Sequence, residues 1–598
     1  MYNSYGLIDG HQRMRSRSRS RVCSFTTSLI LSFVIIMLFV IIFSNLSYFL
    51  DNDSFILTPD PNLIIAKHGA VASEIANCSQ YGVDILKEGG SAIDAAITSM
   101  ICVGAINIFS SGIGGGGFMT IRLPNGYSEI IDFRETAPLA ARKDMFVDKE
   151  VFASVGGLSI GVPGEVAGMK LAHQKYGKLP WKRLFEPSIK MCRNGFPVTS
   201  ELGLQLQLFS EFVVDNPQLS EIYAPNGNIL KKGQILYRTK FARTLETIAN
   251  NYTEFYKGSI AKSIIKRVHA TGGIMTLDDL KNYRPIVREP IVGFYNDRKV
   301  ITAPEPTSGP ILLFLLNLLE KYDLKNNEID GLNFHRIIEA LKFGFARQTE
   351  LGDSAFFKNK TKHELRIEEI ISKEFADSVR RNISDNETFD PDYYNPVYEP
   401  IDDHGTSHLT VIDADDMTVS VTSSINKPWG SQVMDPDTEI LLNDQMDDFS
   451  VPGTPDMFEL SPSPYNFIEP GKRPLSSMAP TIIEKNGKFE FAVGGSGGKR
   501  IISSVLEVIL DICDFDTNLV DAINKPRYHQ QLLPNMVFVD SGFSFDLIKN
   551  LLDIGHVVQI HHINDRTFSS QIQAIRKFEN GTIHAASDFR KQGLAAGY

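Results

Sequence analysis

Runs of alternating apolar and polar residues predict strands, and they are interleaved with segments of helical periodicity. The strand-like runs are "GFMTIRL", "SHLTVID", "TVSVTSSI" and "KFEFAVGG". In "YGVDILKEGGSAIDAAITSMICVGAI", alanine, leucine and isoleucine recur at helical spacing on both sides of Gly89 and Gly90. This pattern predicts two helices broken at the glycine pair. The mixture of elements predicts an α/β fold.

Two of these strands predict an antiparallel hairpin. "SHLTVI" and "TVSVTSSI" flank "DADDM", a turn-like cluster centred near Asp415, so the paired residues would have numbers that sum to about 830. Ser424 would then lie opposite Thr406. Because strand side chains alternate, one face would carry a set of polar side chains: Thr406, His408, Thr410, Thr422, Ser424 and Asn426. A slip of one residue would reverse that face.

A long apolar run lies near the N-terminus. Residues 22–43 are apolar apart from Cys23 and a few Ser and Thr, and the arginine-rich "RMRSRSRSR" directly precedes them. About 20 apolar residues cross a bilayer, and the following "FSNLSYFLDND" offers no convincing signal-peptidase site. Because positive charge stays on the cytoplasmic side, we expect a cytoplasmic tail at 1–21, a signal anchor at 22–43 and a stalk at 44–60. The rest would be an extracellular ectodomain of a single-pass type II plasma-membrane protein.

Glycosylation sequons agree with that topology. They start beyond the apolar run, at Asn52, Asn77, Asn251, Asn359, Asn382, Asn386 and Asn580. Beyond Cys23, the cysteines that would lie in an oxidising compartment are Cys78, Cys102, Cys192 and Cys513. Four cysteines allow three pairings, and their spacing does not choose among them.

Composition narrows the class of partner. The chain has 598 residues, of which 43% are hydrophobic, an ordinary value for a large globular protein. The net charge is −11, and the basic residues form no long run outside the N-terminus. Both features argue against a nucleic-acid partner.

The Gly405–Thr406 pair at the start of a predicted strand admits two interpretations. A threonine hydroxyl is a weak nucleophile unless a base takes its proton, and one such base is the threonine's own α-amine, whose usual pKa is about 7.7 to 8.0. That amine is free only if the peptide bond before Thr406 is cut. Gly405 offers little hindrance and tolerates a strained backbone, and the acidic, Pro- and Tyr-rich segment 385–403 before it reads as exposed. Taken alone, these residues favour an ordinary strand threonine.

A series of short motifs runs in order from about residue 61 to the last residue. They are "GGSAIDAAI", "GIGGGGFM", "DFRETAP", "GVPGEVAG", "HGTSHLTVID", "VTSSIN", "LNDQMDDFS", "GKRPLSSMAPTI", "GGSGGKRII" and "AASDFRKQGLAAGY". Together they resemble the gamma-glutamyltranspeptidases, or glutathione hydrolases, of the N-terminal nucleophile class. The resemblance implies a four-layer αββα sandwich and self-cleavage into a large chain, 61–405, and a small chain, 406–598, which stay together as a non-covalent heterodimer.

The resemblance also implies an activity. The enzyme would transfer the γ-glutamyl group of glutathione and its conjugates, through a threonyl acyl-enzyme, to water or to an amino acid or dipeptide, and no cofactor or metal is expected. The alternative is a catalytically inactive relative that acts as a surface glycoprotein. Every assigned site position retains suitable chemistry, which favours the enzyme.

The resemblance assigns the catalytic roles. Thr406 would be the nucleophile and its amine the general base. Ser424 stands where the family usually has threonine, so the hydroxyl is kept and a methyl is lost. Gly497 and Gly498 would form the oxyanion hole, just before the predicted helix "KRIISSVLEVILDIC".

Substrate-binding roles follow from the same motifs. The donor's α-amine would be held by Asn426, Gln445 and Asp448. Its α-carboxylate would be clamped by the planar fork of Arg134 with the hydroxyls of Ser476 and Ser477; a surface ion pair of Arg134 with Glu135 or Asp132 is the plainer alternative. Asp447 is excluded because adjacent residues of an extended strand face opposite ways. Cys78 and Cys102 stand at the positions of a family disulfide.

Other patterns receive ordinary interpretations. Gly112, Gly114 and Gly117 fit a dinucleotide fingerprint, but a strand follows them instead of the required helix, so we expect close-packing positions. His404 and His408 are spaced for a metal only on a helix, which is not what we expect there. Pro428 stands where vertebrate relatives have an aromatic residue, and the neighbouring Trp429 would point elsewhere in an extended segment.

Overall fold

The computed structural model describes residues 63–324, 330–399, 405–453, 460–563 and 570–598. The expected cytoplasmic tail, signal anchor and stalk therefore lie outside the described residues, as does His404. Among the residues that are described, no helix is long and apolar enough to cross a membrane.

The described strands form two antiparallel sheets of seven strands each, together with two smaller sheets. The first sheet has the order β1 (Ile64–Ala66), β18 (Ile583–Ser587), β17 (Gln571–Lys577), β13 (Lys488–Ser496), β12 (Thr481–Lys485), β9 (Arg298–Thr302), β8 (Ile291–Tyr295). The second has the order β19 (Ala596–Gly597), β2 (Ala70–Ala72), β10 (Ser407–Ile412), β11 (Thr418–Ser424), β3 (Gly116–Arg122), β4 (Ser128–Asp132), β7 (Ile286–Arg288).

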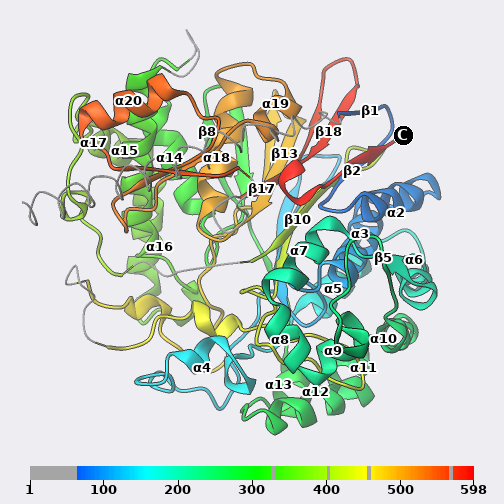
Figure 1. The fold of residues 1–598 in the computed structure, drawn as a ribbon. Helices are drawn as coiled ribbons and strands as arrows, with labels where there is room; N and C mark the ends of the chain where they lie inside the picture. The colour runs from blue at the N-terminus through cyan, green and yellow to red at the C-terminus, as the bar shows by residue number, and fades with distance from the viewer. Residues whose placement is uncertain (1–62, 325–329, 400–404, 454–459, 564–569) are drawn as a thin grey trace, which may run out of the picture. The chain divides into compact units, whose positions relative to one another are not determined.

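Helices cover the outer face of each sheet (Figure 1). The first sheet packs on α14 (Gly309–Leu319), α18 (Arg500–Cys513) and α19 (Leu519–Asn524), with α15 (Gly331–Gln348) against α14, and the second sheet packs on α2 (Ala76–Lys87), α3 (Ala92–Ile106) and α5 (Glu165–Tyr176). Between the sheets lies a separate layer of small and aliphatic side chains, which includes Ala72, Ile412, Ile482 and Ala492. The four-layer αββα arrangement is confirmed.

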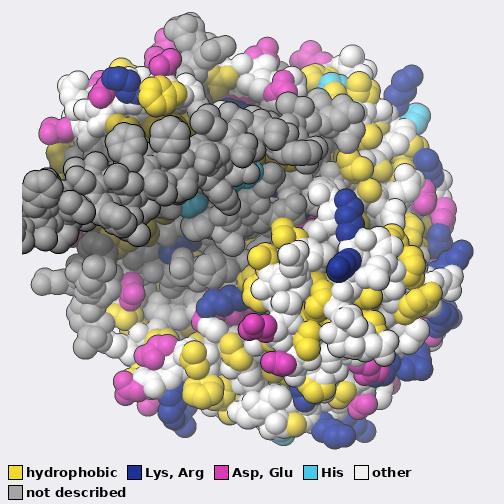
Figure 2. Space-filling model, viewed as in Figure 1, with side chains coloured by type: hydrophobic (Ala, Val, Ile, Leu, Met, Phe, Trp, Pro, Cys, Tyr) yellow, Lys and Arg dark blue, Asp and Glu magenta, His cyan; other side chains and the backbone are white. Residues whose placement is uncertain are grey.

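The remaining helices and strands surround this sandwich. They are α4 (Val151–Ser154), α6 (Trp181–Asn194), α7 (Ser200–Leu208), α8 (Ser210–Asp215), α9 (Pro217–Tyr223), α10 (Thr239–Asn250), α11 (Thr253–Lys257), α12 (Ser259–Ala270), α13 (Leu277–Asn282), α16 (Lys360–Ile370), α17 (Lys373–Arg380), α20 (Phe545–Ile554), β5 (Phe196–Pro197), β6 (Ile235–Leu236), β14 (Tyr528–His529), β15 (Val537–Asp540) and β16 (Val558–His561). On the face drawn in Figure 2, acidic and basic side chains are interspersed outside the grey atoms.

The predicted hairpin is confirmed in both strands and register. β10 pairs with β11 so that Ser407 lies opposite Ser423 and His408 opposite Thr422, which is the predicted sum. The shared polar face is also as predicted, because His408 Nδ1 lies 2.8 Å from Thr422 Oγ1. The intervening Leu409 packs toward the helices. This alternation aims the polar residues of β10 into the space between the two sheets.

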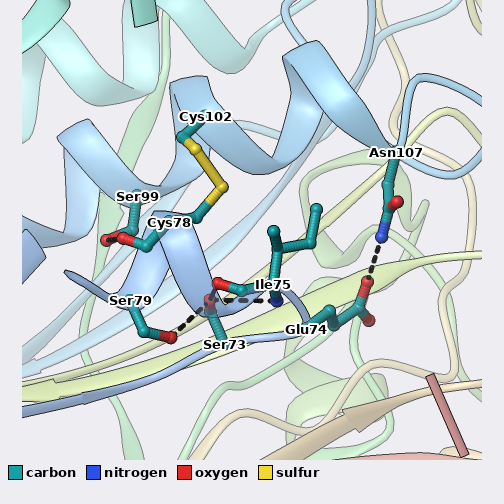
Figure 3. Close-up of a disulfide and its surroundings, with 8 residues drawn as sticks. All are labelled: Ser73, Glu74, Ile75, Cys78, Ser79, Ser99, Cys102 and Asn107. Atoms are coloured by element: carbon teal, nitrogen blue, oxygen red, sulfur yellow. Dashed lines mark hydrogen bonds between the residues drawn. A yellow bond between two sulfur atoms is a disulfide. The ribbon is translucent and has the colours of Figure 1, made fainter. Parts of the chain in front are cut away.

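The two predicted helices before this sheet are confirmed, and a disulfide joins them. α2 ends at Lys87 and α3 begins at Ala92. Cys78 and Cys102 are bonded, with Cα atoms 5.4 Å apart (Figure 3). The pairing that the resemblance implied is therefore present. Gly114 and Gly117 are close-packing positions, since an added Cβ would lie 2.0 Å from the carbonyl oxygens of Leu441 and Thr422 respectively.

The segment predicted to be an exposed approach to Thr406 is partly buried. Tyr394 is almost fully buried against α15, and its hydroxyl donates to Glu339 at 2.8 Å. Arg347 of the same helix donates to the backbone carbonyls of Tyr394 and Asn395. The prediction of an exposed segment holds for most of its described residues, but it was wrong at Tyr394, because a tyrosine buries its ring when its hydroxyl finds a partner. Residues 400–403 lie outside the described residues.

Candidate functional site

The backbone at Gly405 can be formed only by glycine. Its φ is +46°, and a Cβ there would lie 2.1 Å from the carbonyl oxygen of Asn426. An L-residue would meet both a strained φ and a clash with backbone. Thr406 follows at the entrance to β10 and is buried. The sequence therefore holds the Gly405–Thr406 peptide bond in one tightly packed conformation.

Two hydroxyls point at the carbonyl oxygen of Gly405. Thr406 Oγ1 donates to it, and Ser424 Oγ donates to it at 2.7 Å. The backbone N–H of Asn426 donates to Ser424 Oγ at 2.8 Å, so the serine's own proton is directed toward Gly405. Hydrogen bonds of this kind polarise a carbonyl group and stabilise negative charge that develops on its oxygen.

Gly497 and Gly498 form the turn between β13 and α18. Their φ values are +120° and +60°, a region that favours glycine. The predicted helix follows directly and begins at Arg500. The N-terminal end of a helix carries partial positive charge and attracts anions. The two glycines thus lie just before a helix, as the sequence predicts, and their role as an oxyanion hole stays a prediction.

Arg134 lies in the interior and not in a surface ion pair. Its side chain is only 1% exposed, and Nη2 donates to Asp448 Oδ2 at 2.5 Å and to the carbonyl oxygen of Leu475 at 2.9 Å. Glu135 Oε2 is 4.0 Å from Nη1. Leu475 directly precedes Ser476 and Ser477, so Arg134 contacts the backbone next to the two predicted serines.

The residues predicted to bind the donor's amine also meet. Gln445 and Asp448 belong to the short 3-10 helix η6 (Gln445–Asp448), and Gln445 Nε2 donates to Asp448 Oδ2 at 2.6 Å. Asn426 Nδ2 donates to the carbonyl oxygen of Asp444 at 3.2 Å. Asn426 Oδ1 and Gln445 Oε1 are buried acceptors that have no hydrogen-bond partner among the described residues. Buried acceptors are normally paired with a hydrogen-bond donor, and an ammonium group supplies one.

The reason given for excluding Asp447 was wrong. Residues 445–448 form a helical turn and not an extended strand, so alternation does not apply. Asp447 nevertheless has partners of its own outside the predicted donor-binding residues. Its carboxylate lies 2.7 Å from Lys427 Nζ and accepts from Ser154 Oγ at 2.5 Å. The ion pair with Lys427 explains its position.

The side chain of Trp429 points into the core, but the backbone conformation that directs it there differs from the predicted one. The prediction of an extended segment was wrong, because Trp429 has φ +69°. Its ring is fully buried and packs on Phe109, Phe212 and Tyr223. Trp429 therefore belongs to the packing of the helical layer, as its predicted direction away from the site implied.

Burial controls the charge of several groups near Thr406. Desolvation raises the pKa of Glu135 to about 8 and that of Glu165 to about 7. It lowers the pKa of His408 to about 3. His408 is therefore a neutral hydrogen-bonding residue at physiological pH, with its ring against Gly494. The residues of β10 and β11 are themselves all buried.

One group of described residues has the spacing of a metal site: His335, Glu339 and His556. His335 Nε2 faces the carbonyl oxygen of Ser384 at 2.7 Å, so Nε2 carries the proton and Nδ1 accepts from His556 Nε2 at 2.8 Å. Lys342 Nζ lies 3.3 Å from Glu339 and balances its charge. The cluster forms a hydrogen-bonded network within the protein.

Sequence reasoning missed two charged residues beside Thr406. Lys591 Nζ donates to the backbone carbonyl oxygen of Thr406 at 2.7 Å and to Glu74 Oε1 at 2.8 Å. Lys591 lies in the last motif of the sequence, and Glu74 lies in the turn between β2 and α2. No local spacing connects them, so only the fold could bring them together.

Comparison with known proteins agrees with this geometry. The gamma-glutamyltranspeptidase family matches residues 78–598. The chain is 46% identical to glutathione hydrolase proenzyme 1 of Schizosaccharomyces pombe, over 90% of this chain and 85% of that protein. It is 38% identical to the glutathione hydrolase proenzyme of Escherichia coli, over 89% of this chain and 92% of that protein.

Solved structures show the same fold. A cephalosporin acylase from Bacillus halodurans matches with a TM-score of 0.80 at 25% identity, over 91% of this chain and 98% of that one. Gamma-glutamyltranspeptidase from Helicobacter pylori matches with a TM-score of 0.50 at 32% identity, over 53% of this chain and 92% of that one. The second match, to part of this chain, fits a family whose chains are processed. On these grounds, the chain belongs to the gamma-glutamyltranspeptidase family.

Proposed function

We propose that the protein is a self-processing gamma-glutamyltranspeptidase that cleaves the γ-glutamyl bond of glutathione and its conjugates. The observation that carries the proposal is the pair of hydroxyls, from Thr406 and Ser424, on the carbonyl oxygen of Gly405. Family membership and relatives named as glutathione hydrolase proenzymes support it.

The first reaction would be self-cleavage. Thr406 Oγ1 attacks the carbonyl carbon of Gly405, and Ser424 stabilises the negative charge on the carbonyl oxygen. Collapse of this intermediate breaks the C–N bond, the threonine nitrogen takes a proton, and the acyl group passes from nitrogen to oxygen. Water then hydrolyses the ester. The products are a large chain that ends at Gly405 and a small chain that begins with the free amine of Thr406.

The second reaction would use that amine on an external donor. The amine accepts the proton of Thr406 Oγ1, which attacks the γ-carbonyl carbon of the donor. Gly497 and Gly498 would offer backbone N–H groups to the oxyanion at the end of α18. The leaving amine takes the proton, and a γ-glutamyl ester remains on Thr406. Water, an amino acid or a dipeptide then accepts the glutamyl group.

Recognition of the donor would depend on its α-amino acid end. Asn426 Oδ1, Gln445 Oε1 and the Asp448 carboxylate offer acceptors to an ammonium group. Arg134, with Ser476 and Ser477, offers donors to a carboxylate. Opposite charges placed side by side on the protein match the zwitterionic end of a γ-glutamyl compound. No part of this arrangement requires a cofactor.

The test is turnover of a chromogenic γ-glutamyl anilide by the purified chain from residue 61 onward, with cleavage followed on a denaturing gel. We expect two chains and release of the aniline. Correctly cleaved protein without turnover would support the inactive surface glycoprotein instead. An α-glutamyl anilide is the matched control, because it carries the same atoms with the wrong carbonyl adjacent to the leaving group.

We further propose that the protein is a type II plasma-membrane protein with residues 22–43 as its anchor. The sequon asparagines that the structure describes, Asn77, Asn251, Asn359, Asn382, Asn386 and Asn580, are all exposed, as glycosylation requires. Glycosidase should lower the apparent mass of the membrane-bound protein, and protease added outside intact cells should reach it. Resistance to both treatments would contradict this topology.

A further inference from the structure

The side chain of Lys591 makes three contacts at the nucleophile. Lys591 lies in the 3-10 helix η8 (Phe589–Lys591) near the C-terminus and is buried. Its ammonium group donates to the Thr406 carbonyl oxygen at 2.7 Å, to Glu74 Oε1 at 2.8 Å and to Ser496 Oγ at 3.0 Å. An ammonium has three donors, so these contacts use its full capacity.

The partner carboxylate is held just as firmly. Glu74 lies in the turn between β2 and α2 and is buried. Its Oε2 accepts from Ser407 Oγ at 2.9 Å and from Asn107 Nδ2 at 3.3 Å. Figure 3 shows the hydrogen bond from Asn107 to Glu74, with Ile75 between this pair and the disulfide that joins α2 to α3. Both ends of the ion pair are therefore fixed to different parts of the fold.

This ion pair links the residues on which catalysis depends. Ser496 directly precedes Gly497 and Gly498, so Lys591 connects Thr406 to the start of the glycine turn. The β10 ladder begins at Ser407, and after cleavage Thr406 would be a chain end. A hydrogen bond to its carbonyl oxygen restricts rotation about the Cα–C bond. That restriction fixes the directions of the α-amine and of Oγ1.

We infer that the Lys591–Glu74 ion pair is a positioning device for Thr406 that also sets the electrostatic potential at its α-amine. The inference rests on the proposed function, because the α-amine is free only after self-cleavage. Burying two charges costs free energy that burying two apolar residues would not cost. The location of the pair at Thr406 therefore explains its presence better than a contribution to stability does.

The two members of the pair act on the amine with opposite sign. A cation close to an amine disfavours its protonated form and lowers its pKa, whereas an anion raises it. Among the described residues, three further titratable groups on neighbouring strands and turns are neutral or held by their own partners. His408 is neutral, Glu165 accepts from Ser423 on the other face of β11, and the Asp444 carboxylate accepts from the backbone N–H of Lys427.

The experiment compares Lys591→Met, Glu74→Gln and the double variant with the wild type. For each purified, cleaved enzyme, kcat, KM and the acid limb of the pH profile of kcat/KM are measured with the γ-glutamyl anilide. We expect kcat to fall roughly 10- to 150-fold in Lys591→Met, as for the loss of a charged hydrogen bond, with KM little changed. Lys549→Met is the control, because it removes an exposed lysine paired with Asp553.

The direction in which the acid limb moves distinguishes an electrostatic effect of the ion pair on the amine from a merely structural role. The acid limb should move to higher pH in Lys591→Met and to lower pH in Glu74→Gln, and it should lie closer to the wild type in the double variant. Equal shifts in both single variants, or no shift in either, would overturn the inference. If Lys591→Met does not fold, Glu74→Gln and Lys591→Arg decide it: the first should move the limb to lower pH and the second should leave it in place.

Failure of the proposed function would look different. In that case wild-type enzyme would lack a small chain that begins at Thr406. A wild type with that N-terminus and an ordinary acid limb, beside variants whose limbs and kcat are unchanged, would overturn the role of Lys591 and Glu74 alone.

Discussion

The site has two parts that differ in how far the chain satisfies its own polar groups. The nucleophile corner consists of Gly405, Thr406, Ser424, Glu74 and Lys591. Its hydroxyls and charges contact one another or nearby backbone. The donor corner consists of Arg134, Asn426, Gln445, Asp448, Ser476 and Ser477. In it, Asn426 Oδ1 and Gln445 Oε1 have no partner among the described residues.

This difference corresponds to the order of the two proposed reactions. The nucleophile corner acts first on its own chain, so its geometry must be complete before any ligand arrives. The donor corner acts afterwards on a molecule from outside, so part of its hydrogen-bonding capacity is left for that molecule. Variants in the two corners should therefore separate self-cleavage from turnover.

Removing the nucleophile should have the largest effect. Thr406→Ala eliminates the attacking hydroxyl and should leave one uncut, inactive chain. Thr406→Ser keeps a hydroxyl and should cut more slowly, because the β-branched side chain holds its rotamer more tightly. Denaturing gels over time give both rates. Cleavage should not depend on protein concentration, and a rate that rises with concentration would indicate a contaminating protease.

Substitution of Ser424 should slow self-cleavage strongly and change donor binding hardly at all. Ser424→Ala removes one donor to the Gly405 carbonyl oxygen and should slow self-cleavage about 100- to 1000-fold. Ser424→Thr restores the residue usual in the family and is the matched control that should cut normally. Time courses of freshly purified proenzyme measure the rates. Normal cutting by the alanine variant would show that Ser424 does not stabilise the oxyanion.

Substitution of Arg134 should weaken donor binding and leave self-cleavage unchanged. Arg134→Lys keeps the charge but loses the bidentate fork, so donor binding should weaken by about 1.5 to 3 kcal/mol, or roughly 10- to 150-fold. Self-cleavage should proceed as in the wild type, since Arg134 contacts Asp448 and the Leu475 carbonyl oxygen in the donor corner. Titration of cleaved enzyme with a γ-glutamyl inhibitor measures the affinity. An unchanged affinity would mean that Arg134 is not the clamp.

The smallest expected effect is the contribution of His408 to the pH dependence of stability. Burial lowers the folded-state pKa of His408 to about 3, so between pH 6.5 and 3 the unfolded state binds more protons. Stability therefore falls as pH falls through this window, by about 1.4 kcal/mol from this residue between neutral pH and pH 5.5. His408→Gln should lose that dependence. Thermal unfolding of both proteins at the two pH values tests it, and parallel changes would contradict it.

Sequence patterns predicted the elements whose periodicity is local. The β10–β11 register follows from alternation and a compact turn, and the α2–α3 break follows from Gly89 and Gly90. The residues of the donor corner were found through motifs, and the fold brings Arg134 to Asp448 across more than 300 positions. The turn at Gln445–Asp448 was mistaken for a strand because four residues are too few to show a period.

Long-range charge pairing was beyond the sequence. Glu74 and Lys591 are 517 positions apart, and neither residue type nor spacing marks them as partners. Tyr394 was read as exposed because its neighbours are acidic, although its hydroxyl finds Glu339 on α15. In each case the deciding contact joins elements that are distant in the chain, and only packing reveals it.

The N-terminal sequence of the small chain tests the central claim most directly. Fully active enzyme should contain two chains, and the smaller one should begin Thr-Ser-His-Leu and end at Tyr598, without a covalent bond to the larger. Mass spectrometry of the intact small chain gives the same boundary independently, after removal of any glycan. A start at Thr406 is expected if Thr406 attacks the Gly405 carbonyl. A start at any other residue in fully active enzyme would contradict this mechanism.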